Sequence, residues 1–418
     1  MRSIILFIIF FIFLELPFYA KAQNYTLNDL QIMLLKENPK LKSMMLEVEM
    51  AKKRIPISSS LDDPKLKIAI NSLPVDTWSF KDEDMTTKEI GISQMVPLGG
   101  KLSIKEEIAL KEYKSLIEKL RKEKAEMLHM LRMNVYEIYY IRESLKIIDE
   151  IENYLQILVD SEAASAKSGM GKLTNVVKVN IELTMLQEEK INLKQKEEEF
   201  RKKIAYLLAT ENVNLNINFD CNMEKPFLNE IKEKVLDQNP ELKMFQIEKE
   251  KSELEVVLKK KEFYPDLEIS FSYMQRDKSK AGMKRPDMIS AMASINIPIW
   301  AKDKNIPMIE EMEKKRSMIN TLIEDKKNEL ERKVETIFSF IEKWQNLYNL
   351  YVKNIIPQNE LALDTIISRY KVGDVEFMPV IDTIRMLLKY KKEAVMMKKE
   401  FFINISELFS LMGEDTPK

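Results

Sequence analysis

Glycine, cysteine and histidine are scarce in this chain of 418 residues, and each scarcity excludes a class of site. Only 8 glycines occur, and neither G-x-x-x-x-G-K-[ST] nor G-x-G-x-x-G is found, so the sequence has no nucleotide-binding loop. A single Cys221 and a single His129 supply neither a disulfide nor a His/Cys metal cluster. The 66 basic and 67 acidic residues give no electrostatic basis for binding nucleic acid. We therefore expect no metal site, no cofactor, no nucleic-acid partner and no enzymatic activity.

Charged residues are abundant instead: Asp, Glu, Lys and Arg make up 32% of the chain, which is typical of long solvated helices. At the start, Arg2 precedes an apolar run from Ile4 to Leu14, and Ala20-Lys21-Ala22 has the pattern of a cleavage site. These features predict a secretory signal peptide over residues 1–22, and the run is short for the alternative, a transmembrane anchor. No later segment has about 18 consecutive apolar residues. We expect an exported chain that enters a membrane only by strands.

The rest of the sequence is a tandem duplication of a unit of roughly 200 residues. Landmarks recur at a constant offset of 201 residues (39 to 240, 64 to 265 and 97 to 298), and a glycine recurs at 169 and 373. We expect a first repeat over 23–208, an inter-repeat strap over 209–228, a second repeat over 229–412 and a C-terminal tail over 413–418.

Each repeat begins with two helices separated by Asn-Pro, because the residue before proline is disfavoured in helical geometry. The expected helices cover 27–37 and 41–57, then 228–238 and 242–262. The period of the apolar residues then changes to two, as in Leu66, Ile68 and Ile70. We predict two hairpins, over 64–97 and 265–298, whose strands have one apolar and one polar face as in a membrane barrel. A half-buried hairpin on a soluble protein is the alternative.

A very long helix follows each hairpin. Residues 101–168 contain neither glycine nor proline and repeat apolar side chains at near-heptad spacing, which predicts a helix about 100 Å long. The second long helix, over 302–372, contains Pro357 and is expected to be kinked there. Return helices are expected over 174–208 and 375–412.

Neither the strands nor the helices complete a structure within one chain. Four strands are too few for a membrane barrel, the smallest of which have about eight. Open sheet edges are not viable in hydrocarbon, because their backbone groups stay unpaired. Helices this long with a narrow apolar seam must also pack beside copies of themselves. We expect several chains to form a closed ring.

Together with the duplication, the motifs at Asn38–Leu41 (NPKL), Gln94–Lys101 (QMVPLGGK) and Tyr370–Gly373 (YKVG) resemble the TolC family of outer-membrane efflux proteins. The resemblance implies a mainly α fold with a small β part. Each chain of a homotrimer would contribute four strands to a 12-stranded β-barrel in outer-membrane lipid and long helix pairs to an α-barrel in the periplasm. The implied partners are a periplasmic adaptor protein and an inner-membrane transporter. The strand–helix junctions would be Pro64, Pro97, Pro265 and Pro298.

The functional residues implied by this resemblance lie at the helix tips farthest from the strands. Gly169, Gly171 and Gly373 would form the tight turns at which the adaptor docks. Tyr370 and Asp382 fall at the positions of a gate tyrosine and a constriction aspartate in the family. These tips would form the periplasmic entrance.

Two gate positions depart from the family pattern. Val375 stands where an arginine is expected, and Pro379 stands where a second aspartate is expected, so the family's closing salt-bridge network does not transfer. Asp374 and Glu376 nevertheless add carboxylates nearby. Our hypothesis is a periplasmic gate that mildly favours cations. The alternative is that these are ordinary helix-start acids, which suit the helix dipole.

The 26 methionines have two interpretations. Thioethers are soft ligands for Cu(I) or Ag(I), and Leu98–Lys101 is similar to the form found in the heavy-metal-exporting branch of the family. Methionine is also a good helix former that fills gaps in cores, which is the interpretation we favour. The predicted function is a passive efflux duct for small molecules or metal ions. The alternative is an exported coiled-coil scaffold or adaptor protein without a pore.

Overall fold

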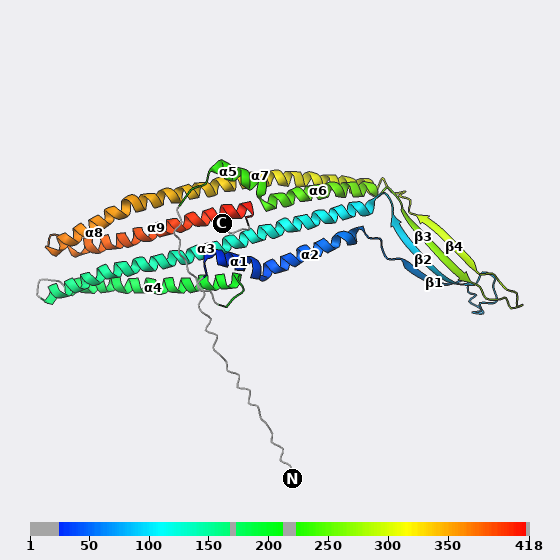
Figure 1. The fold of residues 1–418 in the computed structure, drawn as a ribbon, viewed down its shortest axis with the longest axis horizontal. Helices are drawn as coiled ribbons and strands as arrows, with labels where there is room; N and C mark the ends of the chain where they lie inside the picture. The colour runs from blue at the N-terminus through cyan, green and yellow to red at the C-terminus, as the bar shows by residue number, and fades with distance from the viewer. Residues whose placement is uncertain (1–24, 168–172, 212–222, 415–418) are drawn as a thin grey trace, which may run out of the picture.

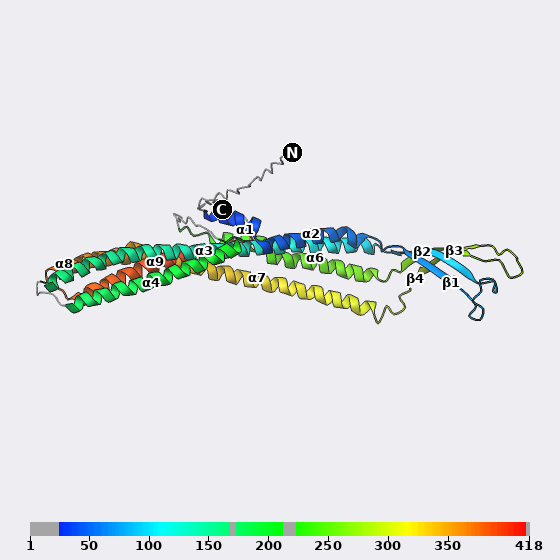
Figure 2. The ribbon, with the colours of Figure 1, turned by 90° about the horizontal axis from the view of Figure 1, so that it is seen from below.

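The computed structural model describes residues 25–167, 173–211 and 223–414. The signal peptide, Gly169, Gly171 and most of the expected strap, including Cys221, lie outside the described residues. The described chain forms a long rod with a sheet at one end and helical turns at the other, and its last helix ends near the middle (Figure 1). Turned by 90°, the helical part stays thin, and the sheet continues its long axis (Figure 2).

The two repeats show the same order of elements. The first contains α1 (Leu27–Glu37), α2 (Pro39–Ser59), β1 (Lys65–Asn71), β2 (Thr87–Pro97), α3 (Lys101–Lys167) and α4 (Leu173–Leu207). The second contains α5 (Leu228–Gln238), α6 (Pro240–Lys261), β3 (Asp266–Gln275), β4 (Met288–Ile295), α7 (Asn305–Leu350), the π-helical turn η1 (Tyr351–Ile355), α8 (Ile356–Lys371) and α9 (Phe377–Met412). The two predicted hairpins and the predicted helices are confirmed, although some ends differ.

The Asn-Pro break has the same geometry in both repeats. The Oδ1 atom of Asn38 accepts a hydrogen bond from the Leu41 N–H at 3.1 Å. The Oδ1 atom of Asn239 accepts one from the Leu242 N–H at 2.9 Å. Each asparagine is thus the N-cap of the next helix, and the proline lies in its first turn, where no N–H is needed.

The two long helices differ in continuity. α3 runs for 67 residues without interruption, as predicted. α7 passes into η1 directly before α8, which carries Pro357 in its first turn. Proline has no N–H to donate and its ring crowds the preceding turn, so a wider π turn accommodates it. The sequence predicts a kink at Pro357, and the structure has this π turn directly before it.

Four predicted helix starts differ from the structure by two or three residues. α2 begins at Pro39 instead of 41 and α6 at Pro240 instead of 242, because each proline fits the first turn of its helix. α7 begins at Asn305 instead of 302, because residues 298–304 form successive turns, closed by bonds such as Lys304 N–H to Trp300 O at 3.0 Å. α9 begins at Phe377 instead of 375, with Glu376 as its N-cap residue.

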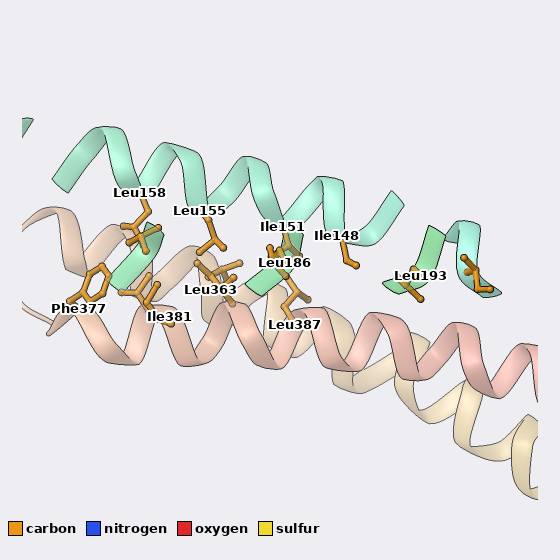
Figure 3. Close-up of a cluster of buried hydrophobic side chains, with 14 residues drawn as sticks. Ile148, Ile151, Leu155, Leu158, Leu186, Leu193, Leu363, Phe377, Ile381 and Leu387 are labelled. Carbon is orange, nitrogen blue, oxygen red and sulfur yellow. The ribbon is translucent and has the colours of Figure 1, made fainter. Parts of the chain in front are cut away.

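The hydrophobic core is spread along the rod. The cluster nearest the helix tips combines buried side chains from α3, α4, α8 and α9 (Figure 3). Leu155 of α3, Leu186 of α4, Leu363 of α8 and Ile381 of α9 are members of this cluster, and each is at most 7% exposed. The helix hairpin of one repeat therefore packs against that of the other.

The four strands form one antiparallel sheet in the order β1-β2-β3-β4. Its centre joins the two repeats, because β2 pairs with β3 from Lys88–Gln275 to Pro97–Asp266. Gly91 lies opposite Ser272, and a Cβ at position 91 would come within 2.9 Å of the Ser272 Cβ. The close approach of β2 and β3 therefore requires glycine at this position.

Candidate functional site

One face of the sheet is apolar and uncovered. Ile68 on β1 is 77% exposed and Ile289 on β4 is 83% exposed. An uncovered apolar surface of this kind indicates an apolar environment or a partner. The apolar side chains of this face are Leu66, Ile68, Ile70, Ile90, Ile92, Val96, Leu267, Ile269, Phe271, Tyr273, Ile289, Ala291, Ala293 and Ile295.

The opposite face is polar. Glu89 lies on it and is 7% exposed, because the Lys67 Nζ lies 3.1 Å from its carboxylate and the Asn71 Nδ2 donates to it at 2.7 Å. Serine side chains from β2, β3 and β4 share this face. A sheet with these two faces suits a barrel wall between lipid and water.

The sheet is open at both edges. β1 and β4 have one strand neighbour each among the described residues. Their outer N–H and C=O groups therefore lack ladder partners, which costs several kcal/mol per group in hydrocarbon. Both edges can pair with strands of other chains.

At the junction of sheet and helices, Lys101 of α3 binds the second repeat. Its Nζ donates to the Asp266 Oδ1 at 2.7 Å and to the Tyr264 main-chain oxygen at 2.8 Å. Gly99, at φ +75°, allows the close approach, since a Cβ there would lie 3.0 Å from the Tyr264 ring. Sequence reasoning identified the Leu98–Lys101 motif but missed this contact, whose partners are more than 160 residues apart in sequence.

The four prolines predicted at the junctions lie close to strand ends. Pro64 and Pro265 directly precede β1 and β3, Pro97 is the last residue of β2, and Pro298 follows β4 after two residues.

At the opposite end of the rod, α8 and α9 are joined by a tight turn. Gly373 has φ +80°, and its N–H donates to the Tyr370 main-chain oxygen at 3.0 Å. No heavy atom lies within 4 Å of a Cβ added there, so the backbone conformation alone favours glycine. Arg369 closes the turn with an ion pair to Asp374 at 2.7 Å.

Tyr370 links this turn to the first repeat. Its Oη donates to the carboxylate of Glu162 on α3, which is 3% exposed and also accepts from Asn175 of α4 at 3.0 Å. The ring packs edge-on against Phe377, with centroids 6.2 Å apart. Burial, followed by the bond to Glu162, raises the pKa of Tyr370. Glu162 could not be identified from the sequence, because it is one of many acids on α3.

The predicted carboxylates are not gathered into one cluster within the chain. Asp374, Glu376 and Asp382 are all exposed. Asp374 pairs with Arg369, whereas Asp382 lies 3.3 Å from Arg385. Arg385 in turn makes two hydrogen bonds to Glu182 of α4. A second connection between the repeats therefore lies beside Asp382.

In residues 25–167, 173–211 and 223–414 no group of three or more His, Cys, Asp or Glu side chains is placed to hold a metal ion. Met127 is packed in the core at 8% exposure, whereas Met130 is 46% exposed. No helix within the same ranges is both long and apolar enough to cross a membrane.

No protein-family model and no curated protein matches this sequence. Solved structures do match. The outer-membrane channel OprN has a TM-score of 0.76 and 15% identity, over 94% of this chain and 91% of that one. The open MtrE outer membrane channel of Neisseria gonorrhoeae has a TM-score of 0.76 and 14% identity, over 93% of this chain and 89% of that one. The outer membrane protein VceC of Vibrio cholerae has a TM-score of 0.74 and 13% identity, over 92% of this chain and 95% of that one.

This chain has the fold of outer-membrane channels. At these identities the likeness concerns the fold, and it extends over nearly the whole chain. The mainly α architecture with four antiparallel strands, expected from the resemblance to the TolC family, is confirmed.

Proposed function

We propose that this chain is one protomer of a homotrimeric efflux duct in the bacterial outer membrane. Three sheets would pair edge to edge, with β4 of one copy beside β1 of the next, to close a 12-stranded barrel. The apolar face would contact lipid, and the helices would continue as a tunnel through the periplasm. The observation that carries this proposal is the sheet's uncovered apolar face together with its two unpaired edges. A closed ring of copies in a bilayer would cover the face with lipid and pair both edges.

Exposed apolar stripes on the helices support side-by-side packing of protomers. Their members recur at intervals of about four residues, which places them on one helix face. On α2 they are Leu46, Met50 and Ile57, and on α4 they are Leu173, Val177, Ile181 and Met185.

The helix tips would form the periplasmic entrance. A periplasmic adaptor protein would dock around the turn at Gly373 and around Gly169 and Gly171, which the sequence predicts to form the tip of the first repeat. An inner-membrane transporter would supply the energy for export of small molecules or metal ions. The duct itself would use no cofactor and catalyse no reaction.

The contact between Tyr370 and Glu162 supports a gate at these tips. It fastens the helix hairpin of one repeat to that of the other, so parting the hairpins requires breaking it. Threefold repetition would place the exposed carboxylates of Asp374, Glu376 and Asp382 in rings around the entrance. Rings of carboxylates favour cations.

The test combines fractionation, mass and conductance. The full-length chain is expressed with its signal peptide, and the protein is purified from the membrane fraction in detergent. Its mass is measured by light scattering, and it is then inserted into planar bilayers. We expect a trimer that conducts ions with a preference for cations. A monomer in the soluble periplasmic fraction, without conductance, would refute the duct and support the exported scaffold or adaptor.

A further inference from the structure

The seam between the two repeats inside one chain has a counterpart at the open edges of the sheet. Inside the chain, Pro97 at the end of β2 pairs with Asp266 at the start of β3. The offset of 201 residues that relates the repeats leads from Pro97 to Pro298, just beyond β4. The same offset leads back from Asp266 to Lys65, the first residue of β1. In the proposed duct, the end of β4 would therefore meet the start of β1 of the next copy as β2 meets β3 within the chain.

On one side of this seam, the two repeats differ in chemistry. Inside the chain, Gly99 lies against the ring of Tyr264, in the short link between α6 and β3. At the same offset of 201 residues, Phe263 and Tyr264 correspond to Asp62 and Asp63, in the link between α2 and β1. Two acids at the β1 edge therefore stand where the second repeat has two aromatic side chains.

On the other side of the seam, the link that follows the strand is longer and basic in the second repeat. Residues 98–100 join β2 to α3, whereas residues 296–304 join β4 to α7. The longer link carries Lys302 and Lys304, which are both exposed, and Trp300, which is 70% exposed. The β4 edge therefore presents a basic surface with an exposed aromatic side chain.

The charges of these two links lack partners in the described part of the chain. The side chains of Asp62 and Asp63 make no hydrogen bond or ion pair with any residue that the structure describes. Those of Lys302 and Lys304 make none with the described residues either. β1 and β4 lie at opposite edges of the sheet, which separates the acids from the lysines within one copy (Figure 1). Opposite charges at opposite edges complement each other between copies.

The short helices beside these links show the same missing neighbour. α6 packs against both α3 and α7, whereas α2 packs against α3 and has no comparable contact with α7 among the described residues. Ile57 of α2 is accordingly 66% exposed, whereas its counterpart Leu258 of α6 is partly covered. In a ring of copies, α7 of one copy would take the missing place beside α2 of the next. Trp300 lies just before α7 and would cover the end of that α2.

We propose that Lys302 and Lys304 of one copy form ion pairs with Asp62 and Asp63 of the next copy. The contact closes each seam between protomers and selects the partner, because a neighbour that offered its second hairpin would present the two aromatic side chains instead. Exposed ion pairs add little affinity but favour the correct partner. This inference rests on the proposed duct and identifies the residues through which it recognises a second copy of the chain.

Disulfide cross-linking of the full-length chain tests the contact. Lys302→Cys and Asp63→Cys are combined in a Cys221→Ser background, and the protein is oxidised in the membrane and run on a non-reducing gel. We expect covalent dimers and trimers, because a disulfide forms only between Cα atoms less than about 7 Å apart. Asp76→Cys with Lys302→Cys, which combines opposite ends of the strands, is the control and is expected to run as a monomer.

Reversal of charge gives an independent test. Lys302→Glu/Lys304→Glu is expected to lower the yield of trimer by about threefold or more, because like charges then meet at every seam. Asp62→Lys/Asp63→Lys is expected to cause a similar loss. The variant with all four changes is expected to recover the wild-type yield, which a variant that merely failed to fold would not do.

Lys278→Glu/Lys284→Glu, which changes two exposed lysines of the β3–β4 loop, is the matched control and is expected to form trimers like the wild type. The absence of a cross-link between positions 63 and 302, or a fourfold charge exchange that does not recover trimer, would overturn the contact. So would normal trimers of Lys302→Glu/Lys304→Glu that bind vesicles of anionic phospholipid more weakly, because the lysines would then contact lipid headgroups.

The proposed function and this contact fail in different ways. Wild-type protein that forms conducting trimers, while the cysteine variant does not cross-link, refutes the contact alone. Wild-type protein that stays monomeric and conducts no ions refutes the duct.

Discussion

The side-chain amide of Asn239 donates a hydrogen bond to the main-chain oxygen of Leu411 at 2.7 Å, across 172 residues of sequence. Asn38 makes the equivalent bond to Leu207 at 2.8 Å. In each repeat, the side chain of one buried asparagine therefore makes two hydrogen bonds. It accepts one from an N–H at the start of α2 or α6 and donates one to a C=O at the end of α4 or α9. The Asn-Pro motif therefore connects the two ends of its repeat.

Replacing Asn239 by alanine is expected to lower the free energy of unfolding by about 1–3 kcal/mol, because buried backbone groups lose their partners. Asn239→Asp is expected to lose at least as much, because its buried carboxylate still accepts from the Leu242 N–H but faces the Leu411 oxygen, which is also an acceptor. Denaturant unfolding of the detergent-solubilised protein measures both. Asn328→Ala, at an exposed position on α7, serves as the control, and equal losses at 239 and 328 would contradict the role of Asn239.

Lys101→Met is expected to destabilise the junction between α3 and the sheet by about 1.5–3 kcal/mol, because hydrogen bonds to charged groups are lost. The Lys101 side chain is 9% exposed, so methionine fills its space without supplying the donor. Hydrogen exchange at the start of α3 and at Asp266 is expected to become faster. Lys105→Met, at an exposed position of the same helix, is the matched control, and identical exchange in the two variants would argue against the contact.

A substitution by lysine is expected to impair membrane insertion on one face of β3 and not on the other. Phe271→Lys places a charge on the apolar face and is expected to disfavour membrane insertion by about 2–4 kcal/mol near the bilayer midplane. Ser272→Lys, one residue along on the polar face, is expected to insert normally and to weaken the cation preference. The yield of trimer in the outer-membrane fraction measures insertion. Equal yields from the two variants would show that this sheet does not cross lipid.

The contact between Tyr370 and Glu162 at the helix tips is expected to weaken in alkaline solution. The pKa of Tyr370 is raised above its usual 10.0, so the folded state holds this proton more tightly than the unfolded state does. Its contribution to stability is complete below pH 10.0 and is lost as the pH rises further. We expect wild-type conductance to increase only well above pH 10.0, as the pH passes the raised pKa of Tyr370 and the proton between Tyr370 and Glu162 is lost.

Tyr370→Phe is expected to conduct more than the wild type at neutral pH and to show a smaller further increase in alkali, because its tip lacks the hydrogen bond from the start. Tyr206→Phe controls for the general effect of alkali, since Tyr206 is 81% exposed. If Tyr370→Phe followed the wild-type pH curve, the contact would have no role in opening.

Local patterns in the sequence predicted the elements of the fold well. The alternation through Leu66, Ile68 and Ile70 predicted β1 and its apolar face, and Asn38-Pro39 predicted the break between α1 and α2. These features depend on neighbouring residues, so the sequence displays them directly. The start of α7 was predicted less well, because turns over residues 298–304 use side chains that are also common in helices.

Contacts between the repeats could not be predicted. Glu162 and Tyr370 are 208 residues apart, and Glu162 has no local feature that separates it from the other acids of α3. Lys101 was noticed only as part of a motif, since its partner Asp266 belongs to the other hairpin. The predicted gate acids were identified by position, but their partners Arg369 and Arg385 became apparent only once the helices were packed.

The pairing of β2 with β3 leaves unlike strands at the two edges, one from each repeat. A junction that pairs β1 of one copy with β4 of another is heterologous, so every partial assembly still presents one free edge of each kind. Only ring closure removes the last two edges, and until then each intermediate remains prone to aggregation. Assembly is therefore expected to be cooperative, with newly exported monomers and complete rings as the main populations. In the proposed duct, the duplication that gives the chain two hairpins would therefore also determine how copies recognise one another.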